Sequence, residues 1–501
     1  MRSAFIAAIS LVFLSCSVVA KEVIYVTHEV GNDANVGSVS KPLRTITRAI
    51  NLAQPGDTIL VDDGDYRGED TGWGAGVIPI SKSGKPDKWI TIQSRGETKP
   101  VVSSFLLNEC SYIRVKGIHF KGFDFGKVKN WKDMPTIVRD KYSEKRPDFT
   151  LEYPTRAKQI EAEFATYLGL IKQLEYTNAI ELRQVSHVEL RENRIEGYWA
   201  GIQCKGSKDV RIEKNEIRHT VNGIFSWKPS PALQNSFIRE NVIEQSLDIG
   251  ISVQEGSNGV AIRDNTVRHS GTSHISLHNG VRKSTIAGND VSYGGYYAET
   301  MKYPGCSGIS VHSSLDGNSI VENKVSYQLD HTNIDGNGII LDLMKDGSSV
   351  LIRGNLSKRN MGAGINLTKS PNCQILDNTL AQNGYRSSGY RVGAGIKLAR
   401  DQDVNNQILN NVFITNREAG ILGYRTIKAQ KKINGNRYTT DREPLIWDGY
   451  EVNEADYRTL SAVRAETGFE ATGRWNEGKD VASSSDDDSV RQPVPKPKLP
   501  K

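Results

Sequence analysis

The chain is poor in cysteine, carries no strong net charge and, beyond its first twenty residues, contains no long apolar run. Lys and Arg number 64 against 58 Asp and Glu, and the basic residues are scattered along the 501 positions. A weak, dispersed positive charge argues against nucleic-acid binding. No later segment reaches the roughly 18 apolar residues needed to cross a bilayer, so we expect no stable membrane insertion.

Cysteine is too sparse to form a disulfide framework. Four cysteines follow the leader, at Cys110, Cys204, Cys306 and Cys373. Cys204 falls on the inward phase of a predicted strand, which favours a buried free thiol. A disulfide stays open as an alternative in an oxidising compartment.

The first twenty residues have the pattern of a cleaved signal peptide. A charged start is followed by an apolar run from Ala4 to Leu14 and by small residues up to Ala20. This pattern predicts a secreted or periplasmic protein with a leader over 1–20. Cys16 suggests a lipoprotein site as a weaker alternative, because Phe13 stands where such sites usually have Leu. We expect a monomer.

The 3.6-residue period of helical repeats and the L-x-x-L-x-L pattern of leucine-rich repeats are both missing. The chain instead repeats a motif with an apolar residue, two others, Asn, one other and another apolar residue, as in 212–217. The spacing runs from 22 residues, Asn193 to Asn215, to 34, Asn289 to Asn323. The asparagines of the column are Asn193, Asn215, Asn241, Asn265, Asn289, Asn323, Asn355, Asn378, Asn411 and Asn436. Repeats of this length are typical of a solenoid.

Each repeat contains short runs in which apolar and other residues alternate, as in 210–213 and 249–253. A period of two predicts strands with one face directed inward. The sequence therefore predicts an all-β, right-handed parallel β-helix in which each coil stacks on its neighbours. The Asn column is interpreted as a structural ladder at a coil corner.

The amino-terminal region carries a recognisable signature. It reads Ile24-Tyr25-Val26, Gly31-Asn32-Asp33, Pro42-Leu43-Arg44-Thr45-Ile46, Pro55-Gly56-Asp57-Thr58-Ile59 and Gly64-Asp65-Tyr66-Arg67. This signature resembles the opening of bacterial right-handed β-helix proteins, including polysaccharide lyases of the pectate lyase, alginate lyase and chondroitinase B types. The resemblance implies a strand, a short helix from about Thr45 to Ala53, and then the first coil. The pattern Tyr457, Leu460, Val463 and Glu466-Thr467-Gly468 resembles the usual carboxy-terminal cap of the same group.

The predicted organisation has six parts. They are the leader (1–20), an amino-terminal cap with the first coils (21–121), an inserted helical segment (122–178), the regular coils (179–440), a carboxy-terminal cap (441–475) and a disordered tail (476–501). Within the inserted segment we expect a helix from about Thr155 to Leu174, and within the second cap a helix over Ala455–Thr467. The tail is rich in Ser, Asp, Pro and Lys, which cannot bury a core.

A Gly-Ile signal follows most asparagines and begins the strand that we expect to form a cleft floor. Three insertions lengthen the turn before this strand, namely Asn289 to Gly308, Asn323 to Gly338 and Asn378 to Gly395. The fourth residue after each Gly must face outward. In successive coils, counting His274 as a Gly equivalent, this column contains His278, His312 and Asp342. Only 9 histidines occur in the chain, so two beside a carboxylate in one column predict a catalytic row.

Further candidates surround this row. Lys397 is a candidate catalytic cation, and aromatic or polar side chains are candidates for contacts with sugar rings and carboxylates. The predicted substrate-binding residues are Trp227, Tyr296, Tyr297, His331, Asp335, Asn366, Arg386 and Arg391.

Several activities fit this arrangement. A polysaccharide lyase removes the C5 proton of a uronate with a base that is neutral at working pH, and His312 or His278 suits that role. A C5-epimerase uses the same abstraction, whereas a glycoside hydrolase requires two carboxylates, for which Asp342 and Asp335 are candidates. A non-catalytic carbohydrate-binding protein is the remaining alternative. We predict an exported lyase acting on an anionic polysaccharide, with no cofactor or, as the resemblance suggests, with Ca²⁺ held by Asp330 or Asp335.

Overall fold

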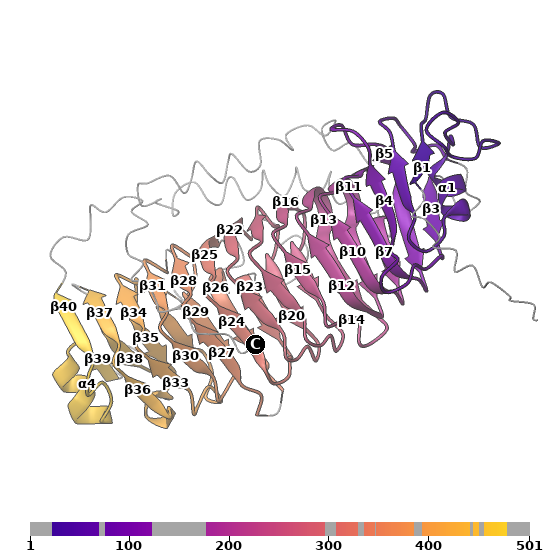
Figure 1. The fold of residues 1–501 in the computed structure, drawn as a ribbon. Helices are drawn as coiled ribbons and strands as arrows, with labels where there is room; N and C mark the ends of the chain where they lie inside the picture. Colours follow the sequence, from indigo (N-terminus) through magenta and orange to yellow (C-terminus); the bar gives the residue numbers. More distant parts are fainter. Residues whose placement is uncertain are drawn as a thin grey trace, which may run out of the picture.

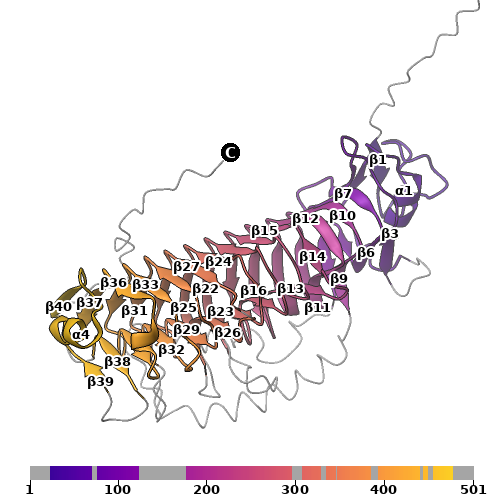
Figure 2. The same cartoon turned by 90° about the horizontal axis from the view of Figure 1, so that it is seen from below.

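A computed structural model gives the structure of residues 23–69, 76–122, 177–295, 307–328, 335–345, 347–384, 393–440, 444–449 and 455–477. Its strands line up along one long axis, from the amino-terminal coils at one end to the carboxy-terminal coils at the other (Figure 1). Seen from below, successive strands stack as the rungs of a single solenoid (Figure 2). The prediction of an all-β parallel solenoid is confirmed.

Sheet 1 is a 15-stranded sheet in which each coil contributes a parallel strand. Its strands are β1 (Val23–Val26), β2 (Thr58–Val61), β4 (Ile90–Ser94), β7 (Ser111–Lys116), β10 (Ser186–Arg191), β12 (Ser207–Glu213), β14 (Leu233–Gln234), β15 (Phe237–Arg239), β18 (Ala261–Arg263), β21 (Thr285–Ala287), β24 (Asn318–Val321), β27 (Val350–Arg353), β30 (Gln374–Leu376), β33 (Gln407–Leu409) and β36 (Lys432–Asn434).

Sheet 2 follows the Asn corner of each coil. Its strands are β5 (Val101–Val102), β8 (His119–Lys121), β11 (Arg194–Lys205), β13 (Glu216–Trp227), β16 (Val242–Ser246), β19 (Thr266–Arg268), β22 (Asp290–Gly294), β25 (Lys324–Gln328), β28 (Leu356–Lys358), β31 (Thr379–Ala381), β34 (Val412–Ile414), β37 (Arg437–Thr440) and β40 (Arg474–Glu477).

Sheet 3 carries the Gly-Ile signal. It shares the long strands β11 and β13 with sheet 2, and its other strands are β3 (Val77–Ile80), β6 (Ser104–Asn108), β9 (Asn178–Arg183), β17 (Ile251–Val253), β20 (Ile275–His278), β23 (Ser307–His312), β26 (Asn337–Asp342), β29 (Ile365–Thr368), β32 (Ile396–Leu398), β35 (Ile421–Gly423), β38 (Ile446–Asp448) and β39 (Ala455–Tyr457).

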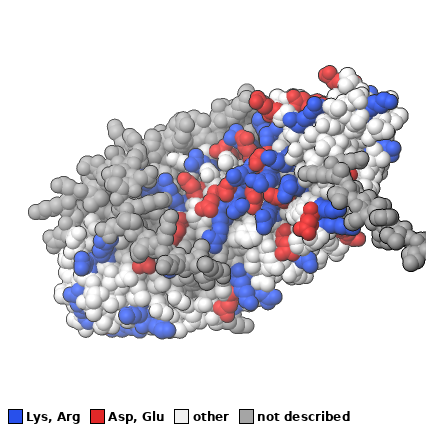
Figure 3. All heavy atoms as spheres, in the orientation of Figure 1, with Lys and Arg blue, Asp and Glu red and all other residues white. Residues whose placement is uncertain are grey.

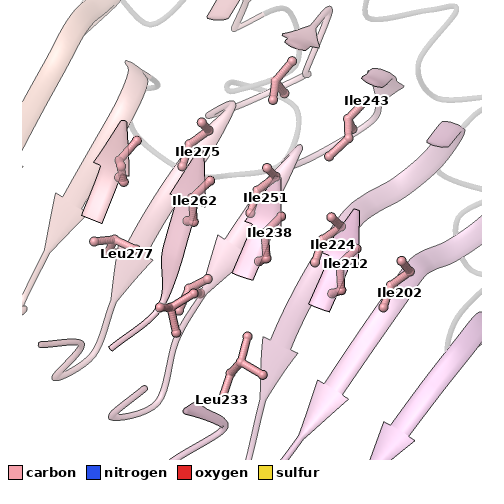
Figure 4. Packing of buried hydrophobic residues seen from close by; sticks show 14 of the residues in the cluster. Ile202, Ile212, Ile224, Leu233, Ile238, Ile243, Ile251, Ile262, Ile275 and Leu277 are labelled. Carbon is pink, nitrogen blue, oxygen red and sulfur yellow. The ribbon is translucent and has the colours of Figure 1, made fainter. Parts of the chain in front are cut away.

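The core consists of aligned apolar columns, one from each inward strand phase. Ile212, Ile238 and Ile262 stack through the parallel registers of β12, β15 and β18, and all three are fully buried (Figure 4). The sheet 3 isoleucines form a matching column on the other side of the interior, visible in Figure 4 at Ile202, Ile224, Ile251 and Ile275. Alternation therefore sets which residues are buried, as the sequence predicted.

The Asn column forms a continuous ladder. In a typical step, the backbone N–H and the side-chain Nδ2 of Asn215 both donate to Oδ1 of Asn241, over 2.9 and 3.0 Å. The ladder ends on Glu470, which is fully buried and accepts from the backbone N–H and Nδ2 of Asn436. Burial raises the pKa of Glu470. The Asn side chain of each coil thus accepts the hydrogen bonds that the turn of the preceding coil donates.

Short helices lie near the two ends of the solenoid. The helix α1 (Ile46–Leu52) is capped by the Thr45 side chain, which accepts from the Arg48 N–H, and this confirms the predicted helix. The helix α4 is shorter than predicted, because it spans only Leu460–Thr467. Ala455–Tyr457 is instead the strand β39, which pairs antiparallel with β38 at the open end of sheet 3. A 3₁₀ helix, η2, covers Ile427–Ala429.

Other expectations concern the cysteines and the chain outside the described ranges. Cys110, Cys204 and Cys373 are free and buried, as predicted for Cys204. The leader, Cys306, the helix expected over Thr155–Leu174 and the tail lie outside the described residues. Among the described residues, no helix is long and apolar enough to span a membrane.

His274 replaces glycine at the start of its sheet 3 strand and is fully buried. Its Nε2 lies 2.9 Å from the Ser292 carbonyl oxygen. Gly294 leaves room for the ring, since a Cβ there would lie 2.1 Å from its Cε1. Burial lowers the pKa of His274 to about 3.

The buried His274 predicts acid sensitivity. Between pH 6.5 and 4.5 the unfolded histidine binds a proton whereas the folded one does not, so stability falls as the pH falls. We expect this group to cost about 2–3 kcal/mol of unfolding free energy over that interval. Denaturant titrations of the wild type and His274→Gln at both pH values measure it, and the variant should show the shallower dependence. Equal pH dependence in both proteins would contradict this account.

Candidate functional site

The predicted outward row lies at the carboxyl ends of consecutive sheet 3 strands. His278 pairs in register with His312, His312 with Asp342, and Asp342 with Thr368. The alternating inward residues of these strands, such as Leu277, Val311 and Leu341, are fully buried. The parallel registers therefore bring all three titratable groups together, one strand spacing of about 4.8 Å apart. The geometry of the row is confirmed, whereas its catalytic role remains a prediction.

The two histidines of the row stack face to face. Their ring centroids lie 5.4 Å apart, with 25° between the planes. Burial and the nearby charge of His312 lower the pKa of His278 to about 4. Near neutral pH, His278 is therefore an uncharged imidazole that offers one N–H donor and one acceptor nitrogen.

His312 forms a pair with Asp342. Its Nε2 lies 3.7 Å from Oδ2 of Asp342, and the two side chains are 32% and 29% exposed. Its Nδ1 is buried and has no hydrogen-bond partner among the described residues, which leaves Nε2 as the nitrogen that can meet a ligand. Burial raises the pKa of Asp342, against the opposing positive charges of His312, Arg400 and Lys369.

Two other predicted residues lie on the same sheet in the neighbouring outward column, two residues before the column of the histidine row. Asn366 and Lys397 pair in register and are 4% and 8% exposed. The Nζ atom of Lys397 lies 5.7 Å from the centroid of the Tyr424 ring. Lys397 is three strands from His312, or roughly 14 Å at the usual strand spacing. The structure therefore does not place Lys397 beside the histidine pair.

Trp227 ends β13 on the amino-terminal side of the row and is 39% exposed. It stacks on Phe225 at 5.5 Å, and Trp199 meets the edge of Phe225 at 5.4 Å. Only β17 lies between β13 and β20, so Trp227 is about 10 Å from His278 along the axis. These three aromatic residues form a platform on the same face as the row.

Asp335 lies at the wrong end of its strand to act with Asp342. It precedes β26 and accepts a hydrogen bond from Nδ2 of Asn337. The extended residues from Asn337 to Asp342 alone span about 16 Å. An inverting hydrolase places its two carboxylates about 6.5–9.5 Å apart and a retaining one closer still. The sequence-based pairing of Asp335 with Asp342 as hydrolase carboxylates is therefore wrong.

The remaining predicted residues, Tyr296, Tyr297, His331, Arg386 and Arg391, lie outside the described residues. The flanking residues show where the three insertions attach, at the amino ends of β23, β26 and β32. The base of the third is narrow, because a Cβ on Gly384 would lie 2.2 Å from the Cα of Gly393. The insertions do share one edge, as predicted, but the histidine row lies at the opposite ends of these strands.

Sequence reasoning missed two cations beside Asp342. Lys369 and Arg400 follow Thr368 and Ala399, the next members of the row's column, and both are exposed. Neither forms an ion pair with any residue that the structure describes. Lys369 has a φ of 51°, so the chain leaves the strand there and alternation stops predicting direction. Their position directly after the outward column was the signal that could have identified them.

The described residues do not fit a calcium site. Calcium takes six to eight oxygen ligands, and the described part of the chain holds no group of three or more His, Cys, Asp or Glu that could bind a metal. Of the two proposed ligands, Asp330 lies outside the described ranges and Asp335 contacts Asn337.

Comparison with known families supports the fold. The family described as a right-handed beta helix region matches residues 178–341 and 300–437. A family described as a protein of unknown function, DUF1565, matches residues 29–256. No curated protein matches the chain.

Solved structures resemble the chain only distantly. The GH136 lacto-N-biosidase from Eubacterium ramulus is 14% identical, with 87% of this chain and 68% of that one covered at a TM-score of 0.46. The complex of XylC with xylose is 13% identical, covering 92% and 86% at a TM-score of 0.46. Pectate lyase Pel9A is 11% identical, covering 87% and 79% at a TM-score of 0.37.

Proposed function

The chain belongs to the right-handed β-helix family, and on that scaffold we propose that His312 and its neighbours cleave an acidic polysaccharide by β-elimination. The observation that carries the proposal is the outward row in which a neutral His278, His312 and Asp342 occupy successive coils. Uronate elimination needs a positioned base that is unprotonated at working pH. The row places the His312 imidazole, whose side chain is 32% exposed, where a substrate can reach it.

In the proposed step, Nε2 of His312 takes the C5 proton of a uronate residue. The electron pair of that C–H bond forms a C4–C5 double bond, and the C4–O bond to the neighbouring sugar breaks. The departing oxygen takes the proton from His312, so the step balances without an external acid. Asp342, 3.7 Å from Nε2, stabilises the imidazolium that forms in between.

The carboxylate of the reacting sugar needs a positive partner while C5 carries developing charge. Arg386 and Arg391 of the third insertion remain the predicted residues for this role. Lys397 is a further candidate. It lies on β32, the strand that the third insertion precedes, three coils from the strand of His312. His278 offers a hydrogen bond to the departing oxygen.

Export from the cytoplasm is part of the same proposal. A leader over 1–20 would place the protein where extracellular polysaccharides occur. Amino-terminal sequencing of the protein recovered from its native host checks this, and we expect the mature chain to begin at Lys21. A mature chain that still begins at Met1 would contradict the export prediction.

The activity is tested on a panel of uronic-acid polymers. We expect new reducing ends and, in step with them, the ultraviolet absorbance of an unsaturated uronate. Reducing ends without that absorbance would indicate a hydrolase. A changed uronate composition without cleavage would indicate an epimerase, and binding without any chemical change would indicate a carbohydrate-binding protein.

Removal of Trp227 should weaken substrate binding more than turnover. Stacking of a sugar ring on an exposed indole contributes about 0.5–1.5 kcal/mol, so Trp227→Ala should raise KM about 3- to 10-fold at nearly unchanged kcat. Steady-state kinetics on the cleaved polymer measure both constants. Phe237→Ala is the matched control, because Phe237 is a 44% exposed aromatic residue on sheet 1. An unchanged KM in Trp227→Ala would remove the platform from the site.

A further inference from the structure

A row of cationic side chains continues beyond Asp342 along the same edge of sheet 3. Lys369 follows β29, Arg400 follows β32 one coil later, and Arg425 follows β35 one coil beyond that; all three are exposed. The parallel registers of β29 with β32 and of β32 with β35 give them equivalent positions. Successive members are therefore about 4.8 Å apart along the axis.

Two of the three cations in this row have no ion-pair partner within the described structure. Lys369 and Arg400 form no ion pair with a described residue. Burial raises the pKa of Asp342, and the positive charges of His312, Arg400 and Lys369 act in the opposite direction. Asp401 and Asp403 are the acidic residues of the turn after β32. Asp403 is fully buried and its Oδ2 accepts from the Arg400 backbone N–H, so Asp401 is the carboxylate that this turn exposes.

Sheet 1 shows the opposite pattern. Basic and acidic side chains are interleaved over the middle of the face seen in Figure 3. Many of them pair across strands, as in Arg114 with Glu189 at 2.6 Å and Arg239 with Glu213 at 2.9 Å. On sheet 1 many of the basic side chains are therefore paired, whereas Lys369 and Arg400 are exposed in successive turns without an ion pair to a described residue.

The opposite end of the histidine row is aromatic and nearly balanced in charge. Lys205, beside Trp227 in register, is paired with Glu181 at 2.7 Å. Glu255 follows β17 in the next coil and carries a charge opposite to that of Lys228. The Nζ atom of Lys228 lies 6.0 Å from the Trp227 ring centroid. The face therefore changes along the axis from an aromatic platform to a cationic row, with the histidine pair between them.

We propose that the cationic row binds consecutive uronate residues, with Lys369, Arg400 and Arg425 each contacting a carboxylate. The inference rests on the proposed function and gives its substrate class: a polymer with a run of adjacent uronates on one side of the cleaved bond. The part of the polysaccharide on the other side of the cleaved bond lies over Trp227. The polymer then runs parallel to the solenoid axis.

Binding measurements on uncleaved polymer test the row. His312→Ala serves as the background, and alginate and polygalacturonate, with consecutive uronates, are compared with hyaluronan, in which every second sugar is a uronate. We expect Lys369→Ala/Arg400→Ala to raise the Kd for the better-bound of the first two polymers about 10- to 100-fold, since charge-assisted contacts are lost. The effect on hyaluronan should be smaller, and added salt should shrink the difference.

The matched control is Arg211→Ala/Arg263→Ala, which removes two exposed arginines from sheet 1 and changes net charge equally. Its Kd should stay within twofold of the background. If the double variant of Lys369 and Arg400 binds like this control, the inference about the cationic row is overturned. The proposed lyase activity is then neither supported nor contradicted by that result. An equal loss for all three polymers overturns the assignment to consecutive uronates. Failure of the unmodified protein to bind any of the polymers instead overturns the proposed function.

Discussion

Replacement of His312 by alanine is expected to lower turnover on the cleaved polymer about 10²–10⁴-fold, the usual contribution of a positioned general base. The side chain is outward and 32% exposed, so its loss should cost little stability. Initial rates from the ultraviolet absorbance of the product measure the effect. A thermal melt of the same sample should be nearly unchanged.

The control for this variant is a histidine on another face. His187 lies on sheet 1, where its ring stacks on Tyr112 at 4.5 Å and its side chain is 41% exposed. His187→Ala should therefore keep full activity. Wild-type turnover in His312→Ala would remove the proposed base and with it the mechanism.

A single alanine in the Asn ladder should have the largest effect on stability. Oδ1 of Asn265 accepts from the backbone N–H and Nδ2 of Asn241, and its own Nδ2 donates to the Ile238 carbonyl and to Asn289. Asn265→Ala removes these four buried hydrogen bonds, at about 0.5–1.5 kcal/mol each, and leaves the buried backbone N–H of Asn241 without its acceptor. We expect unfolding free energy to fall by about 3–6 kcal/mol.

Denaturant unfolding followed by circular dichroism measures this loss as a shift of the midpoint. Coils contact mainly their neighbours, so the damaged coil interface should weaken the whole array. Asn51→Ala, at an exposed helix position, should change stability by less than about 0.5 kcal/mol. An unshifted midpoint in Asn265→Ala would show that the ladder is dispensable.

The repeated parts of the molecule could be predicted because one rule governs every coil. Alternation gave the direction of each strand residue, so the inward isoleucines and the row of His278, His312 and Asp342 followed from counting. The parallel registers then required the row to be continuous. Nothing beyond the strand period was needed.

Features at the ends and turns could not be predicted in this way. Glu470 closes the Asn ladder from 34 residues downstream of Asn436, a distance that no local pattern reveals. Tyr457 belongs to a strand because the last coil leaves an unpaired edge, which the sequence of that segment does not show. Lys369 comes directly after the strand, where the inward and outward alternation of side chains no longer applies. The pairing of Asp335 with Asp342 failed because it ignored the length of the strand between them.

The mass balance of the smallest products tests the central claim most directly. Elimination adds no water, so the masses of the two fragments from one cut must sum to the mass of the starting oligosaccharide. Mass spectrometry of a defined uronate oligosaccharide, before and after treatment, gives this sum. We predict equality, with one fragment lighter by one water molecule than its saturated form. A sum that exceeds the starting mass by one water would show hydrolysis and contradict the account.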